Sequence, residues 1–257
     1  MSDLDGTLLA PGGRVSDRTV HALGLARQAG VPVAFATGRP PRWIGEIARA
    51  TGYHELAICS NGALVYDPAS GRVLDERPLD PALGRRLVTR IGEALDSVSF
   101  GVELGDSFRC GPGYHFGGQD DSSEVRTVPE QELFVATVYK LLVQDRDCSA
   151  DALLEKVAPL VGQDASVTHS GGTGLLEIAA PGVSKASTLQ RFCAARGIDA
   201  AEVVAFGDMP NDLQMLAWAG TSYAMGNAHP DVHALADRQC PRNDQDGVAT
   251  VLEDLFG

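Results

Sequence analysis

Short apolar runs alternate with helix-like segments over the first 80 residues of the chain, and again after about residue 183. This order is typical of a parallel α/β sheet, because parallel strands need long crossover connections that are usually helices. We expect buried strands at residues 31–36, 56–59 and 203–206. Both ends of the chain are therefore predicted to contribute to one α/β core.

Capping and turn residues delimit the elements between these strands. Ser16 can cap a helix that ends at Gly30, and Ser184 can cap another in the second half of the core. Residues 63–74 contain a Pro and Gly turn between two short apolar stretches, as a hairpin would. The local signals agree with the α/β pattern.

The middle of the chain has a different pattern. A helix is expected over residues 81–95, a glycine-rich segment occupies 110–118, and the alternation of apolar and polar residues over 134–143 predicts a strand. We interpret this region as an α+β cap domain inserted into the core. The predicted bounds are 1–80 and 183–257 for the core and 81–182 for the cap.

The composition argues against several classes of function. With 34 acidic and 21 basic residues the formal net charge is -13, and no stretch concentrates Lys or Arg, so no nucleic-acid partner is expected. No window approaches ~18 uninterrupted apolar residues and no basic and apolar leader precedes Asp3, so we expect neither a membrane span nor a secretory signal. Five dispersed cysteines without CxxC spacing favour reduced thiols and a cytoplasmic protein. The oligomeric state is left open.

Polar residues follow several of the predicted strands, at the points where strands meet loops. They include Asp3 and Asp5 near the N-terminus, Thr37 after the run 31–36, and Lys185 and Asp208 in the second half of the core. The carboxyl ends of parallel strands meet at one edge of a sheet. We therefore expect these distant residues to form one crevice.

These side chains suit phosphoryl transfer. A carboxylate such as Asp3 can attack phosphorus, and Asp5 can protonate the departing alcohol and later activate water. Thr37 and the amide of Gly38 can hold phosphate oxygens, while Lys185 can neutralise charge in the transition state.

A metal site is also predicted. Asp208, together with Asp3 and the carbonyl of Asp5, offers the hard oxygen ligands that Mg²⁺ prefers. Ordinary explanations exist for each motif alone: an acidic turn before glycine, a tolerated surface lysine, and helix capping by residues 208–212. Capping does not explain why three acidic sites converge, since they repel one another unless a cation is present.

Taken together, these segments resemble the haloacid dehalogenase superfamily, and within it the Cof-type phosphatases. The motifs occur in both core segments in the family's order. They are Ser2-Asp-Leu-Asp-Gly-Thr-Leu-Leu9, Ala36-Thr-Gly-Arg39, Ser60-Asn-Gly-Ala63, Gly182-Val-Ser-Lys185 and Phe206-Gly-Asp-Met-Pro-Asn-Asp212.

The resemblance implies a Mg²⁺-dependent phosphohydrolase that has a Rossmann-like core and passes through an aspartyl-phosphate. It makes Asp3 the nucleophile and Asp5 the acid and base. The remaining roles that it implies are phosphate stabilisation by Thr37 and Lys185, metal binding by Asp208, a phosphate or substrate contact by Asn211, and metal ligation or its support by Asp212.

The first strand departs from the family pattern. Family members have an apolar strand of several residues before the first aspartate, whereas only Met1 and Ser2 precede Asp3. Strands usually hold ~5 to 6 residues, and each buried apolar side chain contributes about 1.5 to 3 kcal/mol. We hypothesise that the true start lies upstream; otherwise the nucleophile is held less firmly and activity is weak.

Substrate choice is expected to come from the cap, because the core contacts only the phosphoryl group. The resemblance implies a small phosphorylated metabolite such as a sugar phosphate, with flavin mononucleotide and pyridoxal phosphate as other options. A phosphomutase, a weakly active phosphate- or metabolite-binding protein and, less favoured, a 2-haloacid dehalogenase are the alternatives. Candidate substrate or entrance residues are Tyr114, His115, Phe116, residues 169–174, Arg39, Arg42 and Trp43.

Overall fold

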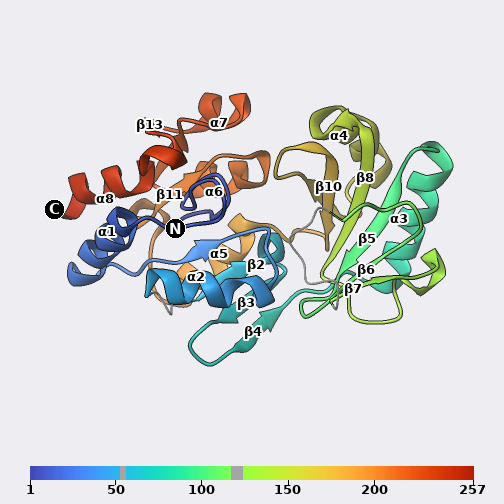
Figure 1. The fold of residues 1–257 in the computed structure, drawn as a ribbon, viewed down its shortest axis with the longest axis horizontal. Coiled ribbons are helices and arrows are strands. Elements are labelled where there is room, and N and C mark those ends of the chain that lie inside the picture. The colour runs from blue at the N-terminus through green and yellow to red at the C-terminus, as the bar shows by residue number, and fades with distance from the viewer. Residues whose placement is uncertain (53–55, 117–123) are drawn as a thin grey trace. The chain divides into compact units, whose positions relative to one another are not determined.

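The computed structural model describes residues 1–52, 56–116 and 124–257, which form two compact units (Figure 1). Unit 1 comprises Met1–Asp75 and Ser184–Gly257, and unit 2 comprises Glu76–Val183. The last two residues of the predicted glycine-rich segment 110–118 lie outside the described residues. Among the described helices, none has the length and apolar character needed to cross a membrane.

Parallel strands form the centre of unit 1. One set contains β1 (Phe35–Ala36) beside β2 (Ala57–Cys59) in parallel, followed by the antiparallel β3 (Leu64–Asp67) and by β4 (Arg72–Glu76). The other contains β11 (Val204–Gly207), β12 (Thr221–Met225) and β13 (Arg238–Cys240), all parallel. The mixed α/β architecture predicted from the sequence is confirmed, as is the hairpin of β3 and β4.

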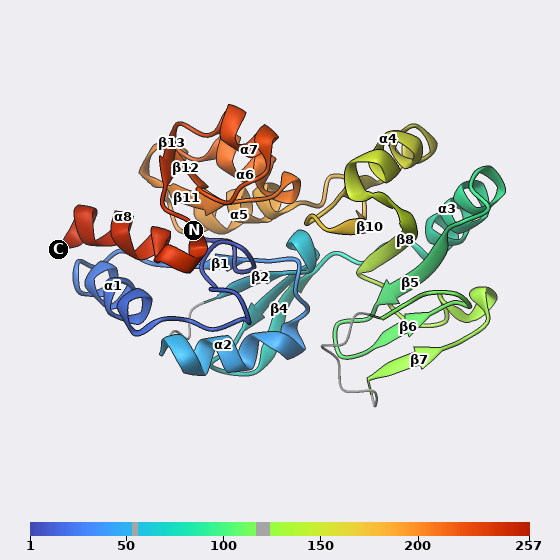
Figure 2. The same cartoon turned by 45° about the horizontal axis from the view of Figure 1, so that its top comes forward.

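Ser2 joins the two sets of strands. It makes a parallel bridge to Phe35 of β1 on one side and to Phe206 of β11 on the other. The N-terminus accordingly lies in the middle of unit 1, near β11 in both views (Figures 1 and 2). Residues 1–3 thus take the place of a central strand, although they are too few to form one.

Helices cover the strands of unit 1. The cap of the first helix is as predicted, because Ser16 accepts a hydrogen bond from the N–H of Thr19. Ser184 and Ser187 form a reciprocal capping box at the start of α5, so this predicted cap is confirmed as well. Helices α1 and α8 pack together (Figure 1). The helices are α1 (Asp17–Gln28), α2 (Ile44–Thr51), α5 (Lys185–Ala194), α6 (Leu213–Trp218), α7 (Pro230–Leu235) and α8 (Gly247–Phe256).

The predicted strand over residues 31–36 is wrong in its extent. Only Phe35 and Ala36 are paired as β1, and Val31 and Pro32 are exposed. The segment around Ser2 lies beside residues 34–36. The N–H of Ser2 donates to Ala34 O at 3.1 Å, and Ser2 bridges to Phe35. Ala34 is thus bonded to this segment, but the strand itself begins only at Phe35.

Unit 2 is an α+β layer structure. Its sheet has the order β7-β6-β5-β8-β10-β9 (Figure 2). Two helices, α3 (Pro81–Ala94) and α4 (Ala150–Val161), share an apolar core with this sheet. The helix predicted over residues 81–95 corresponds to α3. The strands are β5 (Ser99–Glu103), β6 (Phe108–Cys110), β7 (Val125–Thr127), β8 (Lys140–Ser149), β9 (Ser166–Thr168) and β10 (Thr173–Ala179).

The predicted strand over 134–143 is wrong at its N-terminal end. The strand β8 begins at Lys140, whereas Phe134 is buried in a turn against Gly84 of α3, where a Cβ atom would lie 2.1 Å from the ring. Val138 makes an isolated antiparallel bridge to Leu79 instead. Packing of these apolar side chains onto α3 therefore replaces strand pairing, which alternation alone does not reveal.

Candidate active site

Lys185, the first residue of α5, is the centre of a buried polar cluster in unit 1. Its Nζ donates to Oδ1 of Asp3 at 2.6 Å and to Oδ1 of Asp212 at 2.8 Å. Although burial opposes it, the carboxylates of Asp212 and Asp3 raise the pKa of Lys185 above its ordinary value. A cation in the first turn of a helix is disfavoured by the helix dipole, so the two carboxylates explain why a lysine is stable there.

Asp208, which directly follows β11, completes a cluster of three buried carboxylates. One oxygen from each of Asp3, Asp208 and Asp212 lies within 4.8 Å of the others. Burial raises the pKa of Asp208 to about 7, and the charge of Asp212 adds to this rise. Burial likewise raises the pKa of Asp3, although Lys185 opposes the shift.

The cluster fits a divalent cation. Three buried carboxylates beside one lysine leave an excess of negative charge when all are ionised, and such charges repel one another in a buried site. The donors are carboxylate oxygens, the kind that Mg²⁺ prefers. A cation held by these oxygens would compensate the charge that Lys185 leaves unbalanced.

Two small residues of the N-terminal loop position Asp208. Thr7 donates its hydroxyl hydrogen to Oδ1 of Asp208 at 2.8 Å. Gly6 has φ +78° and approaches so closely that a Cβ atom there would lie 2.1 Å from Oδ2 of Asp208. The glycine is therefore required both by the backbone conformation and by the space that the carboxylate occupies.

Asp5 lies in different surroundings from Asp3. Its side chain is 56% exposed, and it accepts hydrogen bonds from Nε of Arg39 at 2.7 Å and from Nη2 at 2.5 Å. The sequence placed Arg39 at an entrance but did not predict this bidentate pair. Asp3, the candidate nucleophile, is thus paired with Lys185, whereas Asp5, the candidate acid and base, is paired with Arg39.

Thr37 and Gly38 follow β1, as predicted. Thr37 is fully buried; its N–H donates to Ile58 O at 2.8 Å and its hydroxyl accepts from the N–H of Arg39 at 3.0 Å. Gly38 lies in the bend between them. The backbone here turns at the carboxyl end of the sheet, where the predicted phosphate contacts would be needed.

Asn61 is a site residue to which the sequence analysis assigned no role. It lies in the turn Ser60–Gly62 after β2, with φ +54°, and its Oδ1 accepts from Nδ2 of Asn211 at 3.1 Å. Among the described residues, neither Nδ2 of Asn61 nor Oδ1 of Asn211 has a hydrogen-bond partner, and both atoms are buried. Left-handed backbone in a Ser-Asn-Gly turn at a strand end is the signal that identifies such a residue.

The turn that carries Asn61 is fixed to the start of α5. A Cβ atom at Gly62 would lie 2.2 Å from Ser184 O, and the hydroxyl of Thr188 donates to Gly62 O at 2.8 Å. This contact holds Asn61 and Lys185 in one rigid region of unit 1.

The candidate substrate residues of unit 2 make contacts within that unit. The rings of Tyr114 and Phe116 pack on Phe108, with centroids 5.5 and 4.9 Å apart. The N–H of His115 donates to Oε1 of Gln144 at 2.8 Å. Residues 169–174 begin at the buried His169 and lead into β10. Their predicted contact with substrate stays a prediction.

The remaining entrance candidates lie near β1. Residues 41–43 form a 3-10 turn, and the guanidinium carbon of Arg42 lies 5.1 Å from the ring centroid of Trp43. This stacking explains their conformation without a ligand.

Comparison with known proteins shows which family the chain resembles. A family model described as haloacid dehalogenase-like hydrolase matches residues 1–252. The chain is 30% identical to the pyridoxal phosphate phosphatase YbhA of Escherichia coli (strain K12), with 97% of this chain and 95% of that protein covered. It is 29% identical to the 5-amino-6-(5-phospho-D-ribitylamino)uracil phosphatase YitU of Bacillus subtilis (strain 168), with 99% and 96% covered.

Solved structures share the fold. A haloacid dehalogenase-like hydrolase from B. subtilis matches with a TM-score of 0.85 and 26% identity, covering 99% of this chain and 98% of that one. The protein SMU.1108c from Streptococcus mutans UA159 matches with a TM-score of 0.87 and 23% identity, covering 99% and 97%. The resemblance inferred from the motifs is confirmed: the chain belongs to the haloacid dehalogenase-like hydrolases.

Proposed function

We propose that the chain is a Mg²⁺-dependent phosphomonoesterase that acts on a small phosphorylated metabolite, with sugar phosphates as the expected substrate class, through an aspartyl-phosphate. The observation that carries the proposal is the buried Lys185 between Asp3 and Asp212, with Asp208 beside them. A phosphate ester carries two negative charges and needs a nucleophile together with positive charge. Relatives named as phosphatases of small phosphorylated compounds support the same assignment.

The reaction has two balanced steps. In the first, a carboxylate oxygen of Asp3 forms a bond to phosphorus, the ester P–O bond breaks, and the departing alkoxide takes a proton from Asp5. In the second, Asp5 takes a proton from water, whose oxygen bonds to phosphorus while the bond to Asp3 breaks. Inorganic phosphate is released and both carboxyl groups return to their starting forms.

The side chains are suited to these roles by their surroundings. Asp3 is buried beside Lys185, which can neutralise charge that accumulates on the phosphoryl oxygens. Asp5 is exposed and held by Arg39, so it can exchange protons with an alcohol or with water. The two-fold hydrogen bond from Arg39 fixes the orientation of the Asp5 carboxylate, which general base catalysis requires.

Asp3, Asp208, Asp212 and the carbonyl of Asp5 are the groups that would hold Mg²⁺, with Asp212 as a ligand or as support for one. When bound, the ion would supply positive charge to the phosphoryl oxygens. Thr37, the Gly38 amide and the Asn61–Asn211 pair are the remaining candidates for phosphate contacts, because polar atoms in this region are buried and, for the two asparagines, unsatisfied within the described part of the chain. Unit 2 is the proposed cap, which would select the organic part of the substrate.

Phosphate release from an aryl phosphate, measured with Mg²⁺ and with EDTA, tests the proposal. Asp3→Asn should lower the rate by at least about 10³-fold, because the amide oxygen is a poor nucleophile. The exposed Asp254→Asn, which makes the same chemical change elsewhere in unit 1, should leave the rate unchanged. Equal rates for Asp3→Asn and the parent protein would refute the mechanism.

Acid quenching during turnover gives a readout independent of the rate. Mass spectrometry of the quenched parent should find phosphate on the peptide that contains Asp3, and the Asp3→Asn chain should lack it. A panel of sugar phosphates, flavin mononucleotide and pyridoxal phosphate then identifies the substrate class. Transfer of phosphate to a second sugar hydroxyl in place of water would indicate a phosphomutase.

A further inference from the structure

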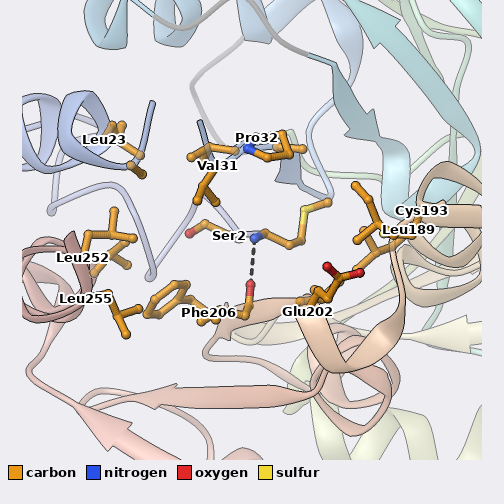
Figure 3. A pocket seen from close by; sticks show the side chains of 18 of the residues that line it. Ser2, Leu23, Val31, Pro32, Leu189, Cys193, Glu202, Phe206, Leu252 and Leu255 are labelled. Carbon is orange, nitrogen blue, oxygen red and sulfur yellow. Dashed lines mark hydrogen bonds between the residues drawn. The ribbon is translucent and has the colours of Figure 1, made fainter. Parts of the chain in front are cut away.

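Apolar side chains of unit 1 reach the solvent in a groove and along a strand. The groove, of about 480 Å³, lies next to Met1 and Ser2 and is lined by side chains of α1, α5 and α8 (Figure 3). The strand is β4, in which Val73 and Leu74 are 42% and 53% exposed. Unlike the groove, the strand lies at the edge of a sheet, so its backbone can also take part in a contact.

The outer edge of β4 (Arg72–Glu76) is open. This strand is the last in the order β1-β2-β3-β4, so within the described part of the chain no strand lies on its other side (Figure 1). All five of its residues are exposed. An open edge presents a row of backbone N–H and C=O groups, which is a template for pairing with a further strand.

A hydrogen-bonded turn fixes β4 against β3. The N–H of Gly71 donates to Asp67 O at 2.9 Å. The carboxylate of Asp67 accepts from the N–H of Ala69 at 2.9 Å and from the hydroxyl of Ser70 at 2.6 Å. The backbone of the edge is therefore already ordered, so pairing with a further strand has a small entropic cost.

The sequence of β4, Arg-Val-Leu-Asp-Glu, is complementary to itself when reversed. Alternate residues of a strand share a face, so Arg72, Leu74 and Glu76 lie on one face of the sheet. We consider a second copy that runs antiparallel, with the two Leu74 residues opposite each other. Arg72 of each copy then lies opposite Glu76 of the other, and opposite residues have Cβ atoms only about 4.5 to 5.5 Å apart. Two ion pairs thus flank a central contact between leucines.

Shifted registers match less well. A two-fold axis places one residue of the strand opposite the same residue of the second copy. With Asp75 in that position the two carboxylates would face each other, which is unfavourable. With Val73 there, only residues 72–74 of each β4 would pair. The register centred on Leu74 is the one in which the charges and the lengths of the strands both fit.

The surroundings of Glu76 are compatible with this ion pair. Its Oε2 accepts a hydrogen bond from the hydroxyl of Tyr139 at 2.6 Å. An ionised carboxylate can accept several hydrogen bonds, so Glu76 can bind a guanidinium as well. The bond from Tyr139 limits the motion of the side chain, which lowers the cost of forming a second contact.

We propose that β4 pairs with β4 of a second copy of this chain, antiparallel and centred on Leu74, so that two four-stranded sheets join at their edges. Five residues from each copy form a small contact compared with the interfaces of stable dimers, so the dimer should be reversible and depend on protein concentration. The proposal does not depend on the reaction assigned to the active site.

Charge reversal tests the register. Sedimentation equilibrium over a series of concentrations should find a monomer–dimer equilibrium for the parent protein. Arg72→Glu and Glu76→Arg should each weaken dimerisation by at least about tenfold, because like charges then lie opposite each other twice in every dimer. An equimolar mixture of these two variants should dimerise again, since one copy then carries two anions and the other two cations. A parent that stays monomeric at every concentration, or a mixture as weak as the separate variants, would overturn the proposal.

Lysine substitutions separate the strand from other apolar surfaces. Leu74→Lys places two ammonium groups opposite each other and should abolish the dimer. Leu235→Lys, at a side chain that is 42% exposed on α7, is the matched control and should leave dimerisation unchanged. Leu255→Lys makes the same change beside the groove and should also have no effect. A dimer that Leu255→Lys disrupts and Leu74→Lys does not would place the interface at the groove and refute pairing through β4.

Hydrogen exchange locates the contact directly. The amides of β4 that point away from β3 should exchange at least about tenfold more slowly at concentrations where the parent is a dimer. In Leu74→Lys the same amides should exchange at a rate independent of concentration. Unchanged exchange of β4 in a parent that does dimerise would contradict the proposal, because the interface would then lie elsewhere.

Discussion

The two ends of the segment Met1–Asp3 lie in opposite surroundings within unit 1. At the carboxyl end, Asp3 contacts Lys185 in a cluster whose members are buried and hydrogen-bonded. At the amino end, Met1 and Ser2 border an open apolar groove. Loops from several strand ends assemble the polar cluster, whereas the groove is lined mainly by apolar side chains of α1, α5 and α8 and by residues 30–34. Hydrogen bonds and charge thus surround one end of this segment, and apolar side chains surround the other.

Lys185→Met should have the largest effect, because it removes the cation that pairs with Asp3 and Asp212. Removal of the cation leaves three buried carboxylates unbalanced, which should lower the free energy of unfolding by about 3 to 5 kcal/mol. The rate of phosphate release should fall by about 10²- to 10³-fold. Thermal unfolding and steady-state kinetics measure both. Lys156→Met, in unit 2 and outside the cluster, is the control and should change neither.

Gly6→Ala tests how tightly the loop encloses Asp208. The new Cβ atom would meet Oδ2, so the carboxylate must move, and we expect the rate to fall by about 10²-fold. Gly12→Ala is a matched control, since Gly12 has φ +86° and no atom within 4 Å of its added Cβ. It should cost about 1 kcal/mol of stability from backbone strain and leave the rate unchanged. Equal rate losses in the two variants would show that strain alone is responsible.

Magnesium binding should depend on pH through Asp208. In the metal-free protein its pKa is about 7, above the ordinary value, so the folded state binds more protons than the unfolded state between roughly pH 4 and 7. The free energy of unfolding of the metal-free protein should accordingly fall as pH rises through this window. Mg²⁺ must displace the proton below pH 7, so its apparent affinity should be roughly 30-fold weaker at pH 5.5 than at pH 8. Titration calorimetry at the two pH values checks this, and equal affinities would exclude Asp208 as a ligand.

Leu252→Ala and Leu216→Ala compare the groove with the enclosed core. Leu252 lines the groove, whereas Leu216 is 1% exposed among the side chains between α5 and α6. We expect losses of about 2 and about 4 kcal/mol respectively, because a site already next to open space loses fewer contacts. Denaturant unfolding measures the losses, and Leu235→Ala, on an exposed side chain, should be nearly neutral.

The sequence indicated which residues meet at the polar end of this segment. Asp3, Lys185, Asp208 and Asp212 belong to short motifs at strand ends, and the α/β topology brings such ends together regardless of their separation in sequence. Cap residues such as Ser184 are equally local signals. The features that could be predicted are those that a few consecutive residues determine by themselves.

The missed features depend on neighbours that are remote in sequence. Residues 31–34 are apolar enough for a strand, yet β1 spans only Phe35–Ala36, because apolar character alone does not determine where strand pairing begins. Phe134 turns toward α3 because Gly84 leaves space for its ring. The bidentate pair of Arg39 with Asp5 and the contact of Asn61 with Asn211 join different loops, so no local pattern indicates them.

The pairing of Arg39 with Asp5 bears on how a substrate reaches the site. Lys185 and Arg39 both contact carboxylates already, and the chain as a whole carries a formal charge of -13. A dianionic phosphate approaching from solution would therefore meet overall repulsion, which salt weakens. The net charge of the chain therefore does not assist the approach of a phosphate ester, which leaves short-range contacts at the site to bind it.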